Sequence, residues 1–379
     1  MPGLAKAGRF DIADIVRAHR AALESSCALS TKQQRVLDDI ERCRTAALGG
    51  HLDRCIECDY EKPAYNSCRN RHCPKCQALA QEKWIAAQEG RTLDLQHFHV
   101  VFTLPEQLRS LARFAPRVVY EALFHAASRT LLEFGERRHM TIGATLVLHT
   151  WTRDLRLHPH VHAIVSGGGL SLDKMRWVAT PRRFLFPIAA MAIVFRAKML
   201  DELRAAYQRD DFARFDDFAD PEAFDVLVRT LAKVDWHLYA KRSFKKATHI
   251  IKYLGRYTHR VGLSNSRLLS VDARAITFRT KGLGKATVTP VEFLRRFVLH
   301  VLPDGFHKIR HVGLNASATK RARVRSLLQL TTPIERDVVW HQLLFDLTGR
   351  DSTRCPHCAA RLMQFPVPRM RGPPVHEKP

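Results

Sequence analysis

Apolar residues recur along the chain at two spacings, which divide it into helical and extended stretches. A spacing of three or four positions dominates residues 10–48, 106–138 and 187–232 and predicts amphipathic helices there. Stretches rich in β-branched and aromatic residues, at 97–104 and 141–151, are typical of strands. The alternation of both kinds of element predicts a protein of the α+β class.

The stretch His158-Pro159-His160-Val161-His162-Ala163 alternates with the period of a strand. Successive side chains of a strand point to opposite faces, so the three imidazoles share one face while Val161 and Ala163 occupy the other. Neutral imidazole is a common ligand for divalent metal ions. The pattern therefore indicates a metal site on a rigid strand, and the alternative is a polar face of hydrogen-bonded histidines.

The chain carries a large excess of positive charge. Its 379 residues include 61 Lys and Arg against 37 Asp and Glu, which gives a formal net charge of +24. Because Lys and Arg neutralise phosphates, this excess favours a nucleic acid over the alternative partner, a membrane surface. The sequence has no apolar run long enough to span a membrane, and residues 1–20 lack the apolar segment of a signal peptide. We therefore expect a cytoplasmic DNA-binding protein without membrane contact.

Four cysteines have the spacing of a zinc ribbon. Cys55 and Cys58 form one CxxC pair, and Cys73 and Cys76 form another after fourteen intervening residues. Each pair can make a tight turn, and four thiolates then close a tetrahedral structural site for Zn²⁺. A closed site performs no hydrolysis, so we expect this module to fold the region and to present polar side chains to DNA. These side chains are Arg69, Asn70, Arg71 and Lys75.

Other residues offer alternative ligands for zinc. Cys68 and His72 lie between the two CxxC pairs, and either could replace one of the four cysteines. Cys355 and Cys358 form a third CxxC pair near the end of the chain. Two ligands do not make a site, so this pair requires His376 or a partner, or it is a remnant.

Two tyrosines follow the histidine stretch after about ninety residues. Residues 245–259 are predicted to form a helix, and Tyr253 and Tyr257 are four positions apart, hence on one face. An aromatic contact in the core is the alternative, but a buried stripe would not carry Lys252 and Arg256 beside it. We therefore expect this helix to bring the tyrosines and the two cations to the histidine strand and not into the core.

Six motifs between about residues 55 and 315 resemble, in content and order, the two-tyrosine transposases of bacterial insertion sequences, which belong to the HUH endonuclease superfamily. The motifs are Cys73-Pro74-Lys75-Cys76 after Arg71-His72, FHVVFTLP at 98–105, His149-Thr150-Trp151, HPHVH at 158–162, YLGRYTHR at 253–260 and GFHKIR at 305–310. The resemblance implies the HUH fold: a central antiparallel sheet flanked by helices, with an amino-terminal zinc ribbon and helical additions.

The resemblance also implies roles for individual residues. His160 and His162 would hold a catalytic Mg²⁺ or Mn²⁺ together with a third side chain from elsewhere in the sheet, and we expect that side chain to be His149. The rivals for the third position are His97, His99, His158 and His259. Tyr253 and Tyr257 would be the nucleophiles, assisted by Lys252 and Arg256.

The motifs suggest a division of the chain into five parts. We expect an amino-terminal helical region (1–50), a zinc-binding domain (51–92), a catalytic domain (93–265) with a helical insertion at about 170–232, a basic carboxy-terminal part of that domain (266–340) and a tail with a single CxxC pair (341–379).

The implied function is rolling-circle transposition. A transposase of this kind nicks and rejoins single-stranded transposon ends and target DNA through a 5′-phosphotyrosine, near the bacterial nucleoid and with a host helicase as a further partner. The nucleotide-binding motif GxxxxGK[ST] is absent, so we expect no ATP site. Alternatives are a rolling-circle replication initiator or relaxase of the same superfamily, a non-enzymatic zinc-ribbon DNA-binding protein, and a three-carboxylate transposase.

Overall fold

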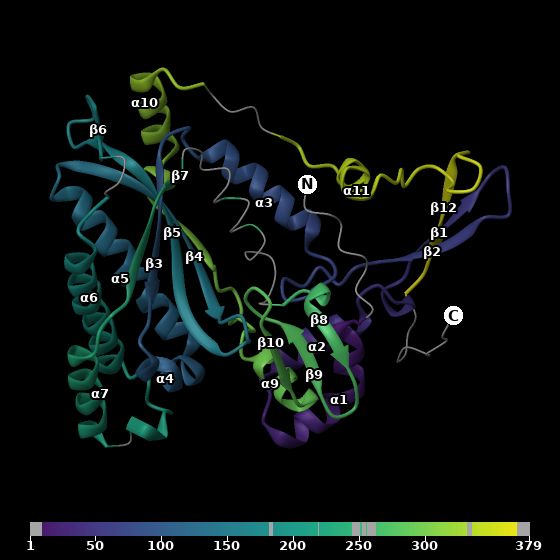
Figure 1. Cartoon of the computed structure of the whole chain (residues 1–379), viewed down its shortest axis with the longest axis horizontal. Coiled ribbons are helices and arrows are strands. Elements are labelled where there is room, and N and C mark those ends of the chain that lie inside the picture. The colour runs from purple at the N-terminus through teal and green to yellow at the C-terminus, as the bar shows by residue number, and fades with distance from the viewer. Residues whose placement is uncertain are drawn as a thin grey trace.

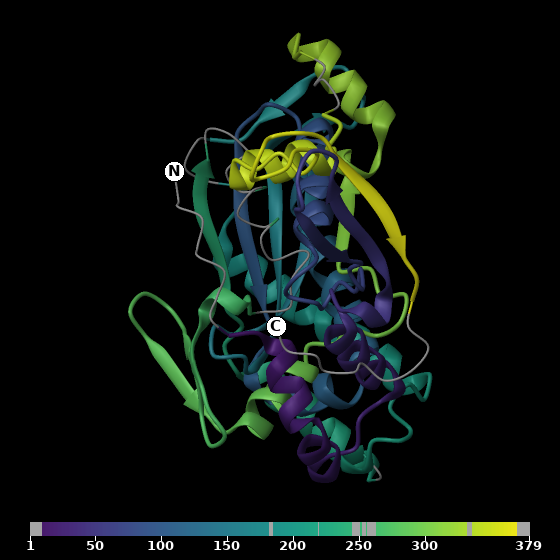
Figure 2. The same ribbon diagram turned by 90° about the vertical axis from the view of Figure 1, so that its right-hand side faces the viewer.

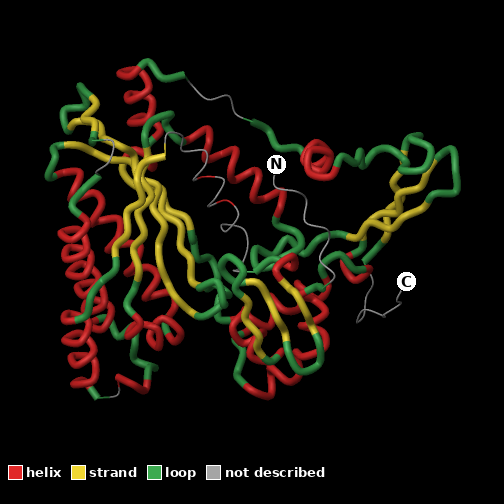
Figure 3. The backbone as a smooth tube through the Cα atoms, viewed as in Figure 1, coloured by secondary structure: helices red, strands yellow, loops and turns green. Residues whose placement is uncertain are grey.

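The strands that the structure describes form three separate antiparallel sheets, which Figure 3 shows as separate groups. This computed structural model describes residues 10–181, 185–218, 220–244, 251, 255, 263–331 and 336–369. The largest sheet has six strands in the order β11-β4-β5-β3-β7, with β6 beside β5. These strands are β3 (His97–Thr103), β4 (Met140–Trp151), β5 (Leu157–Ser171), β6 (Trp177–Ala179), β7 (Leu238–Phe244) and β11 (Ile309–Gly313). The arrangement confirms the predicted α+β fold with an antiparallel sheet.

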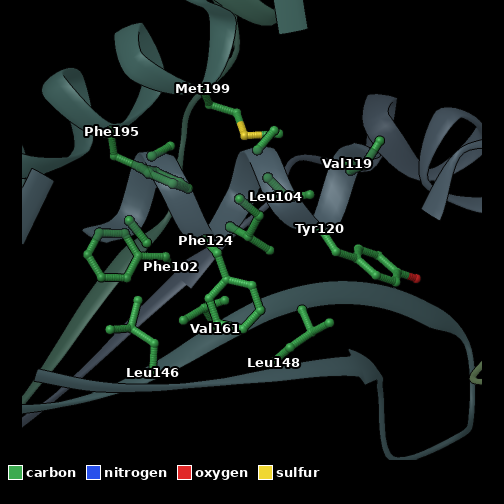
Figure 4. Packing of buried hydrophobic residues seen from close by; sticks show 14 of the residues in the cluster. Phe102, Leu104, Val119, Tyr120, Phe124, Leu146, Leu148, Val161, Phe195 and Met199 are labelled. Carbon is green, nitrogen blue, oxygen red and sulfur yellow. The ribbon is translucent and has the colours of Figure 1, made fainter. Parts of the chain in front are cut away.

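One face of the large sheet is covered by a layer of helices (Figure 1). The layer comprises α4 (Arg109–Phe114), α5 (Pro116–Glu136), α6 (Ile188–Gln208) and α7 (Pro221–Lys233). Figure 4 shows that Phe102, Leu146 and Val161, which come from three neighbouring strands, point toward this layer and belong to one apolar cluster with it. All three side chains are fully buried, because alternate residues of each strand are apolar and face the helices. The segment expected as an insertion thus supplies part of the core.

The opposite face of the same sheet carries the histidines and the long helix α3 (Ala78–Arg91). A small apolar cluster joins α3 to this face: Ile85 of α3 packs with Val147 of β4, Ile164 of β5 and Ile251, and all four are buried. The two faces therefore differ in chemistry, with an apolar side that holds the fold together and a mixed side that is available for function.

The amino-terminal helices pack against residues that lie more than two hundred positions later in the sequence. This unit contains α1 (Ile12–Ser26), α2 (Thr31–Arg42), α9 (Pro290–Val298) and a sheet of β8 (Leu268–Val271), β9 (Ile276–Arg279) and β10 (Lys285–Val288). Its core combines Ile12 and Val36 with Phe278 and Phe293, and all four side chains are fully buried. The predicted helices at 10–48 are present; Ser30 begins α2 with a capping box, in which Gln33 is the reciprocal partner.

The third sheet joins the two ends of the chain. It has the order β12-β1-β2, with β1 (Gly50–Cys55), β2 (Glu61–Tyr65) and β12 (Leu362–Val367). Figure 2 shows β12 alongside the amino-terminal strands. The helices α10 (Ala318–Leu328) and α11 (Trp340–Thr348) lie along the path that leads to β12. Residues 362–367 of the expected tail are thus part of a sheet.

Strand β5 contains three consecutive glycines, Gly167–Gly169, and continues through them to Ser171. The glycines allow close packing: a Cβ on Gly168 would lie 2.7 Å from the ring of Trp177 in β6, so the glycines let β6 approach β5. Among the described residues, every helix is too short or too polar to span a membrane.

Candidate metal centres

The β4–β5 hairpin brings three histidines together on one face of the sheet. In its antiparallel register His149 lies opposite His160, and Val147 lies opposite His162. Residues paired across antiparallel strands point to the same side, and so do residues two positions apart on one strand. The fold therefore directs all three imidazoles to the face that carries α3.

The three imidazoles are close enough to share one ion. Their ring centroids are separated by 4.3 Å (His149 to His162), 5.0 Å (His160 to His162) and 5.4 Å (His149 to His160). One nitrogen from each ring can be chosen so that all three lie within 4.8 Å of one another. The structure thus brings together the three histidines that the sequence grouped, including His149 as the expected third member.

Hydrogen bonds outside the cluster orient two of these rings. The Nδ1–H of His160 donates to the carbonyl oxygen of His158 at 2.7 Å, which leaves Nε2 with a lone pair. The Nδ1 of His162 lies 2.7 Å from Nε2 of His99 on β3. For His162 to offer its own Nε2 to a metal, its Nδ1–H must donate to His99. An outer partner of this kind is typical of metal-binding histidines.

The histidine cluster is electrically neutral near pH 7. Burial holds the pKa of His149 and His162 well below the ordinary value, and each is further lowered by neighbouring imidazoles. Burial also lowers the pKa of His160 and of His99 to about 4. Only neutral imidazole has a free lone pair, so burial keeps these side chains in the form that binds a metal. Three neutral nitrogen donors on a rigid hairpin fit a divalent cation.

The residues on either side of the first candidate tyrosine lie on the same sheet face. Ile251 is buried against Val147, Ile164 and Ile85. Gly255 approaches α3 so closely that a Cβ would lie 2.6 Å from Cγ1 of Ile85. The predicted catalytic residues Lys252, Tyr253, Arg256 and Tyr257, and the rival ligand His259, lie outside the described residues.

Eight of the nine cysteines form two groups of four. The first group consists of Cys43, Cys68, Cys73 and Cys76. The second consists of Cys55, Cys58, Cys355 and Cys358. Within each group all four sulfurs lie within 4.8 Å of one another. Four clustered sulfurs are the donor set of a structural zinc site, and both groups fit that ion.

The predicted ribbon of Cys55, Cys58, Cys73 and Cys76 is therefore corrected. Its two CxxC pairs belong to different groups because a hairpin separates them: Cys55 ends β1 at the tip of the hairpin, while Cys73 follows β2 beyond its base. Five paired residues of a hairpin span about 17 Å at a rise of roughly 3.4 Å per residue, so the tip and the base cannot share one ion. Cys68, the expected substitute, belongs to the first group.

His72 is not a ligand in either group. Its ring is buried, and burial lowers its pKa well below the ordinary value. Nε2 accepts the backbone N–H of Leu302 at 3.2 Å, so the Nδ1–H is directed at the side-chain oxygen of Asn70, 3.0 Å away. The Nε2 contact thus ties the loop after β2 to residue 302, and the Nδ1 contact stays within that loop.

Two family models match the chain, and together they cover most of it. The model described as a transposase zinc-binding domain matches residues 15–104, and the model described as a putative transposase matches residues 143–323. A putative transposase of Sinorhizobium fredii is 39% identical over 368 residues, which are 92% of each chain. The chain belongs to the two-tyrosine transposases of insertion sequences. Such proteins act on DNA.

A more distant relative of the transposase is named after its mobile element. The transposase for insertion sequence element IS801 of Pseudomonas savastanoi pv. phaseolicola is 28% identical over 348 residues, 85% of this chain and 80% of the relative. No solved structure matches the chain significantly. The zinc-binding model and the cysteine groups together support structural zinc in this transposase.

Sequence reasoning missed Cys43 and the partner of the last CxxC pair. Cys43 stands alone between α2 and the hairpin, so no spacing rule selects it. The number of cysteines is a usable signal, because nine cysteines allow two groups of four and leave one over, Cys27. In such an arrangement the third CxxC pair belongs to a group together with another CxxC pair. The missing information was which segments meet in space.

Three of the four side chains expected to face DNA make contacts inside the transposase instead, while Arg69 is exposed. The guanidinium of Arg71 donates to the carbonyl oxygen of Phe306 at 2.8 Å, and Lys75 forms an ion pair with Asp11. The side chain of Asn70 donates to a carboxylate of α2 at 2.7 Å. Asn70 and Lys75 thus hold the module against the unit built on α1 and α2, and Arg71 holds it to residue 306, because a polar group removed from water needs a partner.

Another group of cations lines a cavity between α3, α10 and residues 336–338. Lys83 and Arg91 of α3 and Arg321 of α10 contribute to it, together with Arg336. Burial lowers the pKa of Arg321, and repulsion by Arg91 lowers it further. A site in which cations repel one another favours an anionic ligand.

Proposed function

We propose that the transposase nicks and rejoins single-stranded DNA through a 5′-phosphotyrosine and thereby drives rolling-circle transposition of an insertion sequence. The observation that carries the proposal is the placement of three neutral imidazoles on the sheet face against which Ile251 packs. Tyr253 stands in the sequence between Ile251 and Gly255, both of which lie beside α3.

His149, His160 and His162 would hold the catalytic ion, which we propose to be Mg²⁺ or Mn²⁺ because phosphate oxygens are hard ligands. When bound, such an ion polarises the scissile phosphate and stabilises charge on its oxygens. The protein contributes orientation: the hairpin register fixes the spacing of the imidazoles, and His99 and the carbonyl of His158 fix two ring orientations.

The nucleophile in this proposal is the phenol oxygen of Tyr253 or Tyr257. The oxygen forms a bond to phosphorus as the bond from phosphorus to the 3′-oxygen breaks, and the phenol proton is finally carried by the 3′-hydroxyl. The 5′-phosphotyrosine keeps the phosphodiester energy, so a strand can be rejoined without ATP. Lys252 and Arg256 would lower the pKa of a phenol from its ordinary value of about 10.

Two nucleophiles in one site suit strand transfer from donor to target. After one tyrosine has cleaved the donor, the second can cleave the target while the first remains occupied. The cations that line the cavity beside α3 would hold the sugar-phosphate backbone of the single strand. We place this activity at the bacterial nucleoid, with a host helicase supplying single strands.

The direct test is incubation of a 5′-labelled and a 3′-labelled single-stranded transposon end with the full chain and Mn²⁺, followed by a denaturing gel. We expect a covalent adduct that carries the 3′-labelled fragment, since the 5′-phosphate joins the enzyme, and a shortened 5′-labelled fragment with a free 3′-hydroxyl. The double variant Tyr253→Phe, Tyr257→Phe should bind the DNA without forming the adduct. An adduct of unchanged yield in that variant would contradict the proposal.

The alternatives make different predictions. A replication initiator or relaxase of the same superfamily shares the chemistry, but the zinc-binding model and the names of both relatives favour the transposase. A non-enzymatic zinc-ribbon protein would bind DNA and leave it intact in the same assay. A three-carboxylate transposase would retain cleavage after both tyrosines are replaced.

A further inference from the structure

We propose that Cys55, Cys58, Cys355 and Cys358 bind a second structural zinc ion, which fastens the carboxy-terminal segment of the chain to the amino-terminal hairpin. The zinc-binding family model ends at residue 104 and so contains only half of this site. The two CxxC pairs are separated by almost three hundred residues, and the site exists only when both ends of the chain have folded together.

The sulfur separations match a tetrahedral site. A zinc–sulfur bond of about 2.3 Å places neighbouring sulfurs of a tetrahedron about 3.8 Å apart. The sulfur of Cys358 lies 3.4 Å from that of Cys55 and 3.6 Å from that of Cys58. The sulfur of Cys58 lies 3.7 Å from that of Cys355. A disulfide would require about 2.05 Å, so the four thiols are arranged around a common centre and not bonded in pairs.

The two CxxC pairs have the same local conformation, although they come from opposite ends of the chain. The N–H of Glu57 donates to the sulfur of Cys55, and the N–H of His357 donates to the sulfur of Cys355, each at 3.4 Å. A backbone hydrogen bond closes each turn. The N–H of Cys55 donates to the carbonyl oxygen of Tyr60 at 2.9 Å, and the N–H of Cys355 donates to the carbonyl oxygen of Ala360 at 2.8 Å, so both bonds join residues five positions apart.

These N–H groups point at sulfur and stabilise it in the thiolate form, which is the form that binds zinc. The rings of Tyr60 and His357 meet edge to face at 5.0 Å between centroids and close the side of the site. The second site therefore has the conformation of a zinc ribbon, composed of one turn from each end of the chain.

Zinc at this position would hold more than the two turns. It lies at one end of the β1–β12 pairing, in which Cys55 is opposite Leu362 and Gly50 is opposite Val367. Two residues that stand between α10 and β12 in the sequence, Val338 and Leu343, are buried against Ala86 of α3. Ile85 of the same helix packs on the histidine-bearing face. By holding the segment that packs on the other side of α3, the second zinc ion would therefore help to keep α3 against that face.

The exposure of Cys358 makes the proposal easy to test. Cys358 is exposed and Cys27, the cysteine outside both groups, is half-buried. Without a metal, the exposed thiol should react first with an alkylating reagent. With zinc bound, Cys358 should be protected although solvent reaches it, and Cys27 should react instead. Burial alone would produce the opposite order.

The first experiment is zinc analysis of the purified full chain by mass spectrometry under native conditions. We expect two zinc ions in the wild type and in the Cys27→Ser control, and one in the double variant Cys355→Ser, Cys358→Ser. A wild type with a single zinc, or a double variant that keeps both, would overturn the proposal.

The second experiment uses the wild type alone, so it does not depend on the folding of a variant. The zinc-loaded protein is titrated with a chelator, alkylated, and mapped by peptide mass spectrometry. Cys55, Cys58, Cys355 and Cys358 should become reactive in one common step. Reaction of Cys358 before any zinc is released would contradict the proposal. Neither experiment involves DNA cleavage, so the result is independent of the proposed tyrosine chemistry.

Discussion

The histidine cluster and the cysteine groups are both candidate metal sites, but they are assembled in different ways. His149 and His160 face each other within one hairpin, and only the turn between β4 and β5 separates them in the sequence. The second cysteine group combines residues 55–58 with residues 355–358. The geometry of the histidine cluster is set by the register of one hairpin, whereas the geometry of the second cysteine group depends on how distant parts of the chain fold together.

The difference in assembly corresponds to a difference in role. Four sulfurs around one centre leave no open position, so a zinc ion there can only hold segments together. Three imidazoles leave positions on an ion free for a phosphate, and the fold beneath them is held by the apolar layer on the other face. We therefore expect loss of cysteines to affect stability and loss of histidines to affect activity.

The largest effect is expected for Cys73→Ser. Cys73 and Cys43 are fully buried within the apolar core that joins α1 and α2 to α9. Structural zinc contributes roughly 10–16 kcal/mol in small zinc-finger peptides, which is comparable to the whole stability of a domain, about 5–15 kcal/mol. We expect the variant to lose native near-ultraviolet circular dichroism and cooperative thermal unfolding.

The matched control for that variant is Cys27→Ser, which changes a half-buried cysteine outside both groups. Cys27 packs at the edge of the same core but holds no metal, so the substitution should alter the free energy of unfolding by no more than about 1 kcal/mol. Equal stability of the Cys73→Ser and Cys27→Ser variants would refute the structural role of the first group.

The second largest effect is expected for the double variant His160→Gln, His162→Gln, and it should fall on activity. Glutamine keeps a polar side chain of similar length but is a poor ligand for the ion. Replacing an outer partner of a metal site costs about 10–100-fold, so loss of two direct ligands should reduce Mn²⁺-dependent nicking by more than 100-fold.

Thermal unfolding of this double variant should stay cooperative, in contrast to the cysteine variant. His158→Ala is the matched control, because the backbone carbonyl of His158, and not its imidazole, supports His160. That variant should nick at close to the wild-type rate. A double variant with full activity would remove the histidine cluster from the mechanism.

Local patterns in the sequence predicted which histidines share a face, but they did not predict which cysteines form each group. The alternation around His160 predicted which side chains share a face, and the hairpin placed His149 beside them, because strand period and hairpin pairing are properties of neighbouring residues. The sequence around Cys355 does not indicate that Cys55 is its neighbour in space. The pairing of β12 with β1 joins residues such as Cys55 and Leu362 that are far apart in the sequence, so no local pattern encodes it.

A smaller effect is expected for His99, which touches the cluster from outside. His99→Ala removes the Nε2 acceptor that lies 2.7 Å from His162 and so frees that ring to rotate. We expect a 10–100-fold increase in the Mn²⁺ concentration needed for half-maximal nicking, with a nearly unchanged rate at saturating metal. His99→Gln should restore part of the affinity, since its side-chain oxygen can accept the same proton. An equal loss in both variants would indicate a packing role instead.

The smallest effect is expected for Gly255→Ala, which tests whether α3 positions the segment that carries the tyrosines in the sequence. The new Cβ would lie 2.6 Å and 2.7 Å from Cγ1 and Cδ1 of Ile85, where ordinary contact begins at 3.4 Å, so the Ile85 side chain and the segment must together move apart by about 0.8 Å. A displacement of about 1 Å at a reacting centre can cost roughly 100-fold, so a smaller shift should reduce the nicking rate only several-fold.

The matched control for Gly255→Ala is Gly90→Ala in α3, where no atom outside the helix lies within 4 Å of the added Cβ. Because Gly90 borders the cation-lined cavity, the comparison is made at saturating DNA; there the substitution should leave the nicking rate unchanged and, if anything, stabilise α3, since alanine loses less backbone entropy than glycine on helix formation. Adding Ile85→Ala to Gly255→Ala removes both clashing carbons and should recover part of the lost rate. If Gly255→Ala alone nicks at the wild-type rate, close packing on α3 does not position the nucleophile, and the histidine face must receive it by another contact.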